Sequence, residues 1–260
     1  MGKINLVLPA AGLGSRFRTV GELTPKPLIK VFDLPMIVWV LMNFPLTQYD
    51  KVWVISQRQD GIPGAIHPYT ISLPFAIDFL EIEGLTEGPA STVSLVLDHL
   101  PESEGLIVAN TDQYVFADLA PFIELVRNKS CEGQILTMRA SSNAWSYVGR
   151  DSKGNIDRVV EKVEISKEAT VGVYGWTSVS VAKKAFEDTF TRNIRTNNEF
   201  YVAPTYNYLV AQGLRVETLL VGDHGKEVHG LGLPSDLSLF LKNPEAEGIA
   251  REYKARLKVG

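Results

Sequence analysis

The sequence predicts an α/β protein with a largely parallel sheet, and three observations support this. Short apolar runs that are typical of buried strands lie at residues 4–8, 51–55 and 105–109. Helix-like runs lie between them, which is the βαβ pattern of a parallel sheet. The chain has 260 residues, 45% of them hydrophobic, and can therefore bury a sizeable core.

The other elements follow in chain order. We expect helices at residues 35–43, 93–100, 119–127, 181–190, 200–211, 236–241 (started by Ser235) and 245–258. We expect further strands at residues 75–80, 134–139, 147–150, 159–162, 171–176 and 216–221. Residues 60–74 hold three prolines and two glycines, which predicts irregular structure. Because no linker separates the halves, we expect them to share one sheet.

Composition and charge exclude several functional classes. The net charge of −4 provides no basic surface for nucleic acid. No apolar run is long enough to span a membrane, and the N-terminal apolar run indicates a first strand rather than a signal peptide, so we expect a cytoplasmic protein. The single cysteine, Cys131, excludes an internal disulfide and a cysteine-based metal site, and the four histidines lack metal-ligand spacing.

A loop of small residues follows the first strand. Its free backbone N–H groups could form a concavity that binds an anion. Arg16 and Lys26, which lies between two prolines, would suit a polyphosphate. The pattern is not G-x-x-x-x-G-K-[ST], and Phe17 replaces the third glycine of G-x-G-x-x-G, so an ordinary tight turn remains open. The small residues are Ala10, Ala11, Gly12, Gly14 and Ser15.

Acidic side chains follow later strands. Asp112 comes after the strand at residues 105–109, so it can reach the same crevice as the glycine loop and hold Mg²⁺ together with substrate phosphates. A turn or helix cap is the alternative for Asp112. Glu161, Lys162 and Glu199 lie beside expected strands and a helix start. They could bind the hydroxyls and phosphate of a second substrate, or be ordinary surface charge.

Taken together, the motifs resemble a known family. LPAAGLGSRF followed by TPKPLIKV is similar to the G-x-G-[ST]-R…P-K-P signature of sugar-1-phosphate nucleotidylyltransferases. The blocks TEGPASTV, ANTDQYV, VEKVEISKEATVGVYGW, NNEFYVAPTYN and HGLGLPSDLSLF follow in the family's order. They are most similar to a short, single-domain bacterial branch among capsule and surface-polysaccharide enzymes. The resemblance implies a Rossmann-like, three-layer, mostly parallel sheet of the nucleotide-diphospho-sugar transferase type.

The resemblance also implies a reaction. A nucleoside monophosphate would pass from an NTP to a phosphorylated acceptor, a sugar 1-phosphate or similar, with release of pyrophosphate, for capsule or surface-polysaccharide precursors. Phosphate oxygens are already nucleophilic, so positioning and charge neutralisation would carry catalysis. Residues 1–260 would form a single domain, with 1–140 mainly binding nucleotide and 141–260 mainly binding acceptor. The oligomeric state stays open, and a homo-oligomer is one possibility.

Individual residue roles are carried over from the same resemblance. The glycine loop would hold the nucleotide and its triphosphate, and two residues of the TEGPASTV block would lie along the edge of the nucleotide base. The implied sets are catalytic Arg16, Lys26 and Asp112; nucleotide-binding Ala10, Ala11, Gly12, Gly14, Ser15, Thr86 and Gly88; acceptor-binding Glu161, Lys162 and Glu199; and, as ligand of Mg²⁺, Asp112.

One block departs from the family pattern. Thymidylyltransferases of this family carry a second metal-binding Asp in a W-x-D-T-G-like block, where this chain has His229, Gly230, Leu231 and Gly232. The second metal ligand and the acceptor therefore remain open. Asp236 and Asp223 are nearby acids, although Asp236 also suits the first turn of a helix.

Three other functions stay open. The first is a CTP-dependent cytidylyltransferase that acts on a non-sugar phosphate. The second is a metal-dependent glycosyltransferase. Such an enzyme uses an Asp-x-Asp motif, and Asn110 occupies the position of its first acid, which argues against this hypothesis. The third is an inactive nucleotide-binding subunit, against which the retained Arg16, Lys26 and Asp112 argue.

Overall fold

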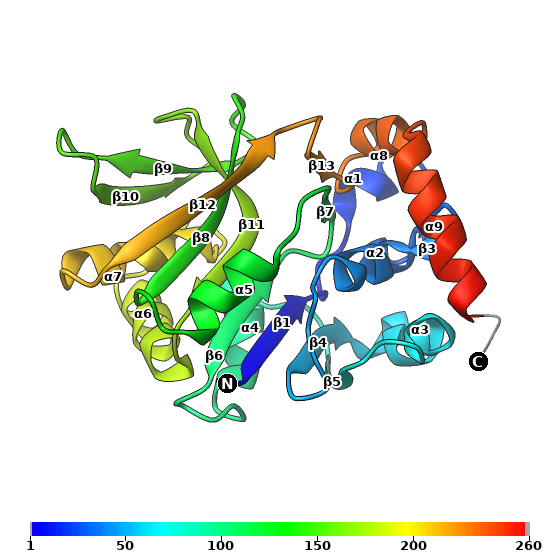
Figure 1. Ribbon diagram of the computed structural model, residues 1–260, viewed down its shortest axis with the longest axis horizontal. Coiled ribbons are helices and arrows are strands. Elements are labelled where there is room, and N and C mark those ends of the chain that lie inside the picture. Colours follow the sequence, from blue (N-terminus) through cyan, green and yellow to red (C-terminus); the bar gives the residue numbers. More distant parts are fainter. Residues whose placement is uncertain (1, 258–260) are drawn as a thin grey trace.

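The centre of the molecule is a nine-stranded sheet (Figure 1). The structure is a computed structural model and describes residues 2–257. The strands of this sheet are β1 (Ile4–Pro9), β4 (Lys51–Gln57), β5 (Ala76–Ile82), β6 (Gly105–Ala109), β8 (Gly133–Arg139), β9 (Ser146–Arg150), β10 (Ile156–Glu161), β11 (Glu168–Trp176) and β12 (Val216–Asp223). The order is β10-β9-β11-β6-β1-β4-β5, with β8 pairing with both β11 and β12.

Both halves of the chain contribute to this sheet, as the sequence predicted. Strands β6, β1, β4 and β5 form a parallel core, and β11 from the second half pairs antiparallel with β6. Strands β8, β9 and β12 run in the same direction as the parallel core. Within the described part of the sheet, only β10 and β11 run in the opposite direction. The sheet is therefore mixed but mostly parallel.

Helices cover both faces and complete three layers. One face carries α2 (Met36–Met42), α3 (Ile62–Thr70) and α5 (Ala120–Arg127), and the other carries α4 (Pro89–Leu97), α6 (Val179–Thr191) and α7 (Tyr206–Ala211). Side chains of β1 alternate between these layers, because Leu6 and Leu8 join the α2 core while Val7 joins the α4 core. A strand that is buried on both faces favours a continuous apolar run, which β1 has at residues 6–8, while the buried Asn5 side chain donates to Glu104.

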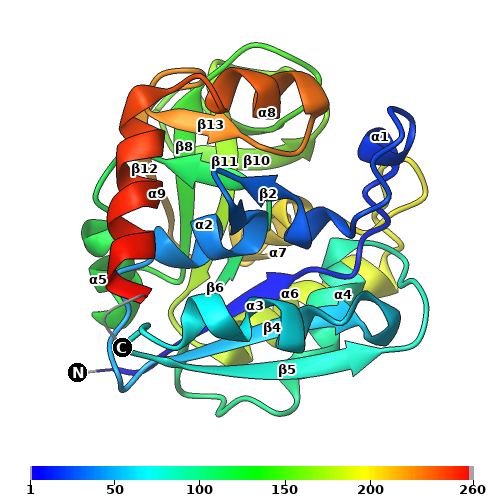
Figure 2. The same cartoon turned by 90° about the vertical axis from the view of Figure 1, so that its right-hand side faces the viewer.

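Short elements surround the sheet. Figure 2 shows the loop with α1 (Ser15–Arg18) projecting beyond the end of β1. The remaining elements are η1 (Lys26–Leu28), β2 (Lys30–Val31), β3 (Leu34–Pro35), η2 (Arg58–Asp60), β7 (Gln113–Val115), η3 (Ala203–Thr205), β13 (Val228–Gly230), α8 (Pro234–Phe240) and α9 (Pro244–Leu257).

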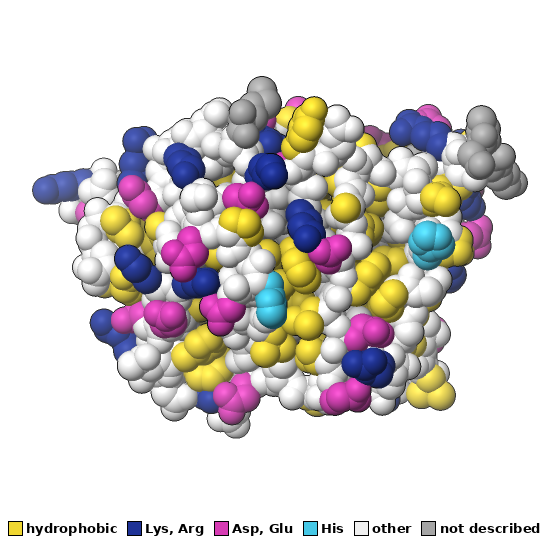
Figure 3. Space-filling model, turned by 90° about the horizontal axis from the view of Figure 1, so that it is seen from below, with side chains coloured by type: hydrophobic (Ala, Val, Ile, Leu, Met, Phe, Trp, Pro, Cys, Tyr) yellow, Lys and Arg dark blue, Asp and Glu magenta, His cyan; other side chains and the backbone are white. Residues whose placement is uncertain are grey.

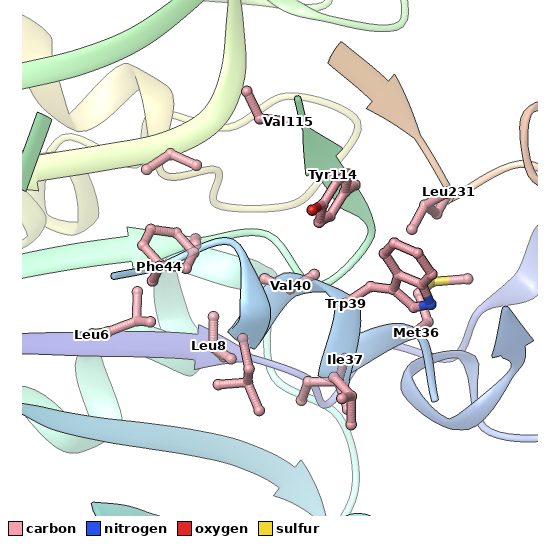
Figure 4. Packing of buried hydrophobic residues seen from close by; sticks show 14 of the residues in the cluster. Leu6, Leu8, Met36, Ile37, Trp39, Val40, Phe44, Tyr114, Val115 and Leu231 are labelled. Carbon is pink, nitrogen blue, oxygen red and sulfur yellow. The ribbon is translucent and has the colours of Figure 1, made fainter. Parts of the chain in front are cut away.

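A cluster around Trp39 fixes the ribbon of β7 and β13 above helix α2 (Figure 4). The Trp39 ring meets Tyr114 of β7 edge to face, with ring centroids 5.0 Å apart, and its indole N–H donates to the Val31 carbonyl at 2.8 Å. Leu231, next to β13, joins the same core. Because β7 begins directly after Asp112, this packing sets the position of the strand end that carries that carboxylate.

The structure corrects three secondary-structure predictions. Residues 60–74 contain the helix α3, because Pro63 lies in the first turn, where its missing N–H costs nothing, and Ile62 and Ile66 are buried in the core. The helix expected at residues 200–211 becomes η3 and then α7, which begins only at Tyr206. Ser235 lies inside α8 rather than before it. The predicted end of the last helix, Lys258, lies outside the described residues.

The surface is mixed in charge. On the face shown in Figure 3, basic and acidic side chains interleave with apolar ones, and no broad basic field of the kind that nucleic acid needs is visible. None of the helices within residues 2–257 has the length and apolar character needed to cross a membrane.

Candidate active site

Two adjoining cavities open beyond the carboxyl ends of β1 and β6. The larger has a volume of about 640 Å³ and the smaller about 450 Å³. They share a boundary on which three cationic side chains lie, so they form one continuous cleft. The residues that line both cavities are Pro9, Arg16, Lys26, Pro89, Thr111, Lys162, Tyr201 and Gly232.

The glycine loop forms one wall of the smaller cavity. Gly14 has a left-handed backbone (φ 61°), and a Cβ on it would lie 2.9 Å from the Cβ of Lys26, so a side chain at this position would push the loop away from η1. Ala11 is buried, and its carbonyl accepts a 2.8 Å hydrogen bond from the Gln57 side chain, which fixes the start of the loop to β4. The loop residues that line this cavity are Ala10, Gly12, Gly14, Ser15 and Arg16.

The Lys26 ammonium donates a hydrogen bond to Asp112 Oδ2 and forms a salt bridge with it. The two side chains are 21% and 22% exposed, so the pair is accessible from the cleft. Gly232 makes room for it, since a Cβ there would clash with Asp112 Oδ2 and lie 3.4 Å from Lys26 Nζ. The backbone N–H of Leu231 donates to the Asp112 carbonyl at 2.7 Å, which ties this glycine to the end of β6. The predicted neighbours Lys26 and Asp112 thus lie together.

Lys162 is held at the boundary by Tyr201. Lys162 follows β10 with a left-handed backbone (φ 58°), and its ammonium donates to the Tyr201 hydroxyl while lying 4.1 Å from the centre of that ring. The Tyr201 hydroxyl in turn donates to Glu199 Oε2 at 2.6 Å. None of the salt bridges within residues 2–257 involves Lys162 or Arg16, so both keep positive charge available to a ligand.

Tyr201 is a site residue that the sequence predictions missed. Burial, followed by its hydrogen bond to the Glu199 carboxylate, raises the pKa of the Tyr201 phenol, so it stays a neutral donor at physiological pH. Its place two residues after Glu199 in the block NNEFYVAP does not by itself predict a contact with Lys162. Arg16 and Tyr201 both line the two cavities, so the glycine loop and this block border the same cleft.

Glu161 is the most buried of the predicted carboxylates, at 8% exposed. Its Oε2 accepts a hydrogen bond from Ser146 on the neighbouring strand β9. Burial raises the pKa of Glu161, although the Ser146 hydrogen bond and the adjacent Lys162 charge oppose this. Glu161 lines the larger cavity, whereas Glu199 lines the smaller one, so the three predicted acceptor-binding residues are divided between the two cavities.

The far wall of the larger cavity contains two residues that the sequence predictions missed, Trp145 and His224, beside Asp236, which was named above as a nearby acid. The rings of Trp145 and His224 lie 5.0 Å apart, and Asp236 lines the same wall. Partial burial lowers the pKa of His224, so its ring is neutral near pH 7. Gly230 leaves open the space next to them, because a Cβ there would lie 3.3 Å from Asp236 Oδ2 and 3.6 Å from the Trp145 ring.

Thr86 and Gly88 do not line either cavity. Gly88 has φ 127°, and a Cβ on it would lie 2.6 Å from the carbonyl oxygen and 2.7 Å from the nitrogen of Phe200. The Thr86 hydroxyl donates to the Gly88 carbonyl at 3.0 Å. The two residues therefore support the segment that carries Glu199 and Tyr201, and their expected contact with a base stays a prediction.

The donor groups fit a magnesium ion that is completed by substrate. Within the described chain no three His, Cys, Asp or Glu side chains gather as a metal site. Mg²⁺ commonly uses one or two carboxylates together with phosphates and water, so the accessible Asp112 carboxylate is sufficient on the protein side. Asp223, named above as an alternative ligand, lies outside both cavities and pairs with Arg139 and Lys226.

Comparison with known proteins decides the family. A family model described as nucleotidyl transferase matches residues 5–208. The chain belongs to the nucleotidyl transferase family. This match covers the glycine loop, Lys26, Asp112 and Tyr201, whereas Gly230, Gly232 and Asp236 lie beyond it. The chain is thus a nucleotidyltransferase whose last cavity wall lies outside the matched region.

Solved structures share the fold of this nucleotidyltransferase. A nucleoside-diphosphate-sugar pyrophosphorylase from Vibrio cholerae has a TM-score of 0.71 at 22% identity, with coverage of 92% of this chain and 100% of that one. A protein from Bacillus anthracis described as a glucose-1-phosphate thymidylyltransferase, in complex with a sucrose, has a TM-score of 0.71 at 16% identity and 96% coverage of each chain. Curated proteins give no match. The predicted Rossmann-like α/β fold is confirmed.

Proposed function

We propose that this nucleotidyltransferase moves a nucleoside monophosphate from an NTP to a phosphorylated acceptor and releases pyrophosphate. The observation that carries the proposal is the junction of two cavities at three cations, Arg16, Lys26 and Lys162. Two phosphorylated substrates that must react with each other need two spaces that meet where negative charge is neutralised. The smaller cavity, walled by the glycine loop, suits the NTP, and the larger suits the acceptor.

The proposed chemical step needs no general base. A phosphate oxygen of the acceptor attacks the α-phosphorus of the NTP, a new P–O bond forms, and the bond from the α-phosphorus to the bridging oxygen breaks. Pyrophosphate leaves with that oxygen and its electron pair. Arg16 beside the glycine loop neutralises the leaving group, while Lys26 and Lys162, which line both cavities, hold the two reacting phosphates in line.

Asp112 would hold the Mg²⁺ that accompanies the nucleotide. Bound there, Mg²⁺ supplies neutralisation of phosphate charge. Lys26 and Asp112 are already in contact, so the ammonium and the metal-binding carboxylate converge on the same phosphates. Gly232 leaves both side chains the room to do so.

We propose that the whole chain acts as one domain, with the base of the NTP near the TEGPASTV block. Support for one domain comes from the shared sheet and from cavity walls that draw on residues before and after position 140. A role in capsule or surface-polysaccharide precursor synthesis, in the cytoplasm where NTPs are made, rests on the resemblance of the sequence blocks.

The proposal is tested by pyrophosphate release. Purified protein is incubated with Mg²⁺, each NTP in turn, and a panel of sugar 1-phosphates and non-sugar phosphates. We expect release with one preferred pair, which also distinguishes a sugar nucleotidyltransferase from a CTP-dependent enzyme for a non-sugar phosphate. Omitting the acceptor is the matched control for simple NTP hydrolysis. Absence of release with every pair would reject the proposed function.

A further inference from the structure

The larger cavity is strongly polarised along its length. Among residues 2–257, the Lys and Arg side chains of its lining are Arg16, Lys26 and Lys162, and all three lie on the boundary with the smaller cavity. Beyond that boundary the charged side chains of the lining are the acids Asp112, Glu161 and Asp236. His224, also on that lining, is neutral because partial burial lowers its pKa. The cavity therefore runs from a cationic end to an end that carries no positive charge.

Asp236 is the acid that is left for a ligand. Asp112 is paired with Lys26. Glu161 is buried and accepts a hydrogen bond from the Ser146 hydroxyl, and its burial raises its pKa. The Asp236 carboxylate accepts only a 3.2 Å hydrogen bond from the Ser235 hydroxyl and takes part in none of the salt bridges within the described chain. A carboxylate in a cleft without a paired cation favours hydrogen-bond donors or positive charge and repels a second carboxylate.

Gly230 gives the ligand access to Asp236. Position 230 has no side chain, and a Cβ there would reach into the space between Asp236 Oδ2 (3.3 Å) and Trp145 (3.6 Å). The Trp145 ring completes the wall with a flat apolar surface, on which a sugar ring face or the methylene groups of a smaller acceptor can pack. Because glycine stands at position 230, in the block that departs from the family pattern, a ligand in the larger cavity can reach the Asp236 carboxylate.

We infer that Asp236 determines which acceptors this site takes: the end of the acceptor remote from its phosphate is neutral or positively charged, and acceptors with a carboxylate there are rejected. The inference rests on the proposed function, since it assigns the larger cavity to the acceptor. Asp236 accepts hydrogen bonds from hydroxyl or ammonium groups of the acceptor, while the boundary cations take its phosphate.

The test measures binding in two matched series of phosphates. The sugar series is glucose 1-phosphate, glucosamine 1-phosphate and glucuronic acid 1-phosphate, and the small series is glycerol 3-phosphate, phosphoethanolamine and 3-phosphoglycerate. Isothermal titration calorimetry on the full chain gives each Kd, so that binding is measured independently of turnover. The variants are Asp236→Asn and, as a matched control outside both cavities, Asp223→Asn.

In the series that binds, we expect the carboxylated member to bind at least about 10-fold more weakly than the neutral one, as one repelled charge warrants. Asp236→Asn should reduce this ratio to below about 3-fold and weaken the ammonium member, while Asp223→Asn should leave every ratio unchanged. Equal binding of carboxylated and neutral members, an unchanged ratio in Asp236→Asn, or binding of none of the six would overturn the inference. Selective binding without pyrophosphate release from any NTP would instead count against the proposed function.

Discussion

Lys26 and Asp112 are 86 residues apart in the sequence, and the Lys26 ammonium donates a hydrogen bond to Asp112 Oδ2. The contact joins the segment after the glycine loop to the end of β6, the two places where a parallel sheet presents ligand-binding groups. It keeps a cation and a carboxylate in a defined position before substrate arrives, while both side chains remain partly exposed to the cleft.

Removing either partner of this contact should abolish turnover. In Lys26→Ala and Asp112→Ala we expect kcat to fall by at least about 100-fold, because each loses charge stabilisation at the reacting phosphates. The fold should survive, since the pair is partly exposed, and thermal unfolding followed by circular dichroism checks this. Lys184→Ala, at an exposed position of α6, is the control and should retain activity. Full activity of Asp112→Ala would remove the role assigned to its carboxylate.

The space at Gly232 should be equally important. Gly232→Ala places a methyl group against Asp112 Oδ2 and 3.4 Å from Lys26 Nζ, so one of them must move. We expect kcat/KM to fall about 10- to 100-fold, the size of effect that a small misplacement of catalytic groups produces. The concentration of Mg²⁺ needed for half-maximal activity should rise as well. Gly248→Ala in α9, where an added Cβ meets nothing within 4 Å, should behave as wild type.

Tyr201→Phe tests whether the phenol positions Lys162. The variant keeps the ring beneath the ammonium but loses the hydroxyl that links Lys162 to Glu199. A hydrogen bond to a charged group is worth about 1.5–3 kcal/mol, so kcat/KM should drop about 10-fold or more. Tyr49→Phe, at a residue that is 69% exposed, should have no effect. An unchanged kcat/KM in Tyr201→Phe would show that the ring alone suffices.

Stability against acid should depend on a buried ion pair. The two oxygens of Asp50 accept hydrogen bonds from Arg127 at 3.1 and 2.9 Å, and both side chains are almost fully buried. Burial acts to raise the pKa of Asp50, but hydrogen bonds from Arg127, Thr47 and Ile4 outweigh it and the pKa is lowered. The pair therefore stabilises the fold above the unfolded-state pKa of about 3.9, and this contribution is lost as the pH falls through the lower folded-state value.

The measurement is urea unfolding of Asp50→Asn and wild type at pH 7 and pH 3. At pH 7 the variant should lose about 3 kcal/mol of unfolding free energy, because the buried Arg127 loses its buried carboxylate and keeps only the half-exposed Glu124 as a counter-charge. At pH 3 the difference should shrink, because unfolding of the wild type then takes up a proton on Asp50 that the folded state, with its lowered pKa, binds less readily. A difference that stays constant between the two pH values would contradict this account. Asp223→Asn, in an exposed ion pair, is the control and should change stability little.

The sequence predicted the fold because its dominant signals are local. Strands β1, β4 and β6 contain short apolar runs at residues 6–8, 52–55 and 105–109, and runs of helical length lie between them. The proline content of residues 60–74 predicts irregular structure, and this prediction is wrong for α3. Pro63 occupies a helix position that tolerates it, and burial of Ile62 and Ile66 outweighs the helix-breaking tendency of Pro68.

The site was predictable where residues follow strand ends and less so elsewhere. The glycine loop and Asp112 could be placed at one crevice from sequence because both follow carboxyl ends of strands in the parallel core. Tyr201, Trp145 and His224 could not, because they come from loops whose approach depends on contacts distant in sequence. Gly88 illustrates the difference, since its tight fit against Phe200 appears only when residues more than a hundred positions apart are brought together.

The most direct test of the central claim follows the label of the transferred phosphate. Wild-type protein, Mg²⁺ and the preferred acceptor are incubated with the preferred NTP labelled with ³²P at the α- or the γ-position, and products are separated by chromatography. Attack at the α-phosphorus predicts that α-label appears in the acceptor product and γ-label in pyrophosphate, in equal amounts. Release of γ-label as inorganic phosphate, or α-label that never reaches the acceptor, would contradict it.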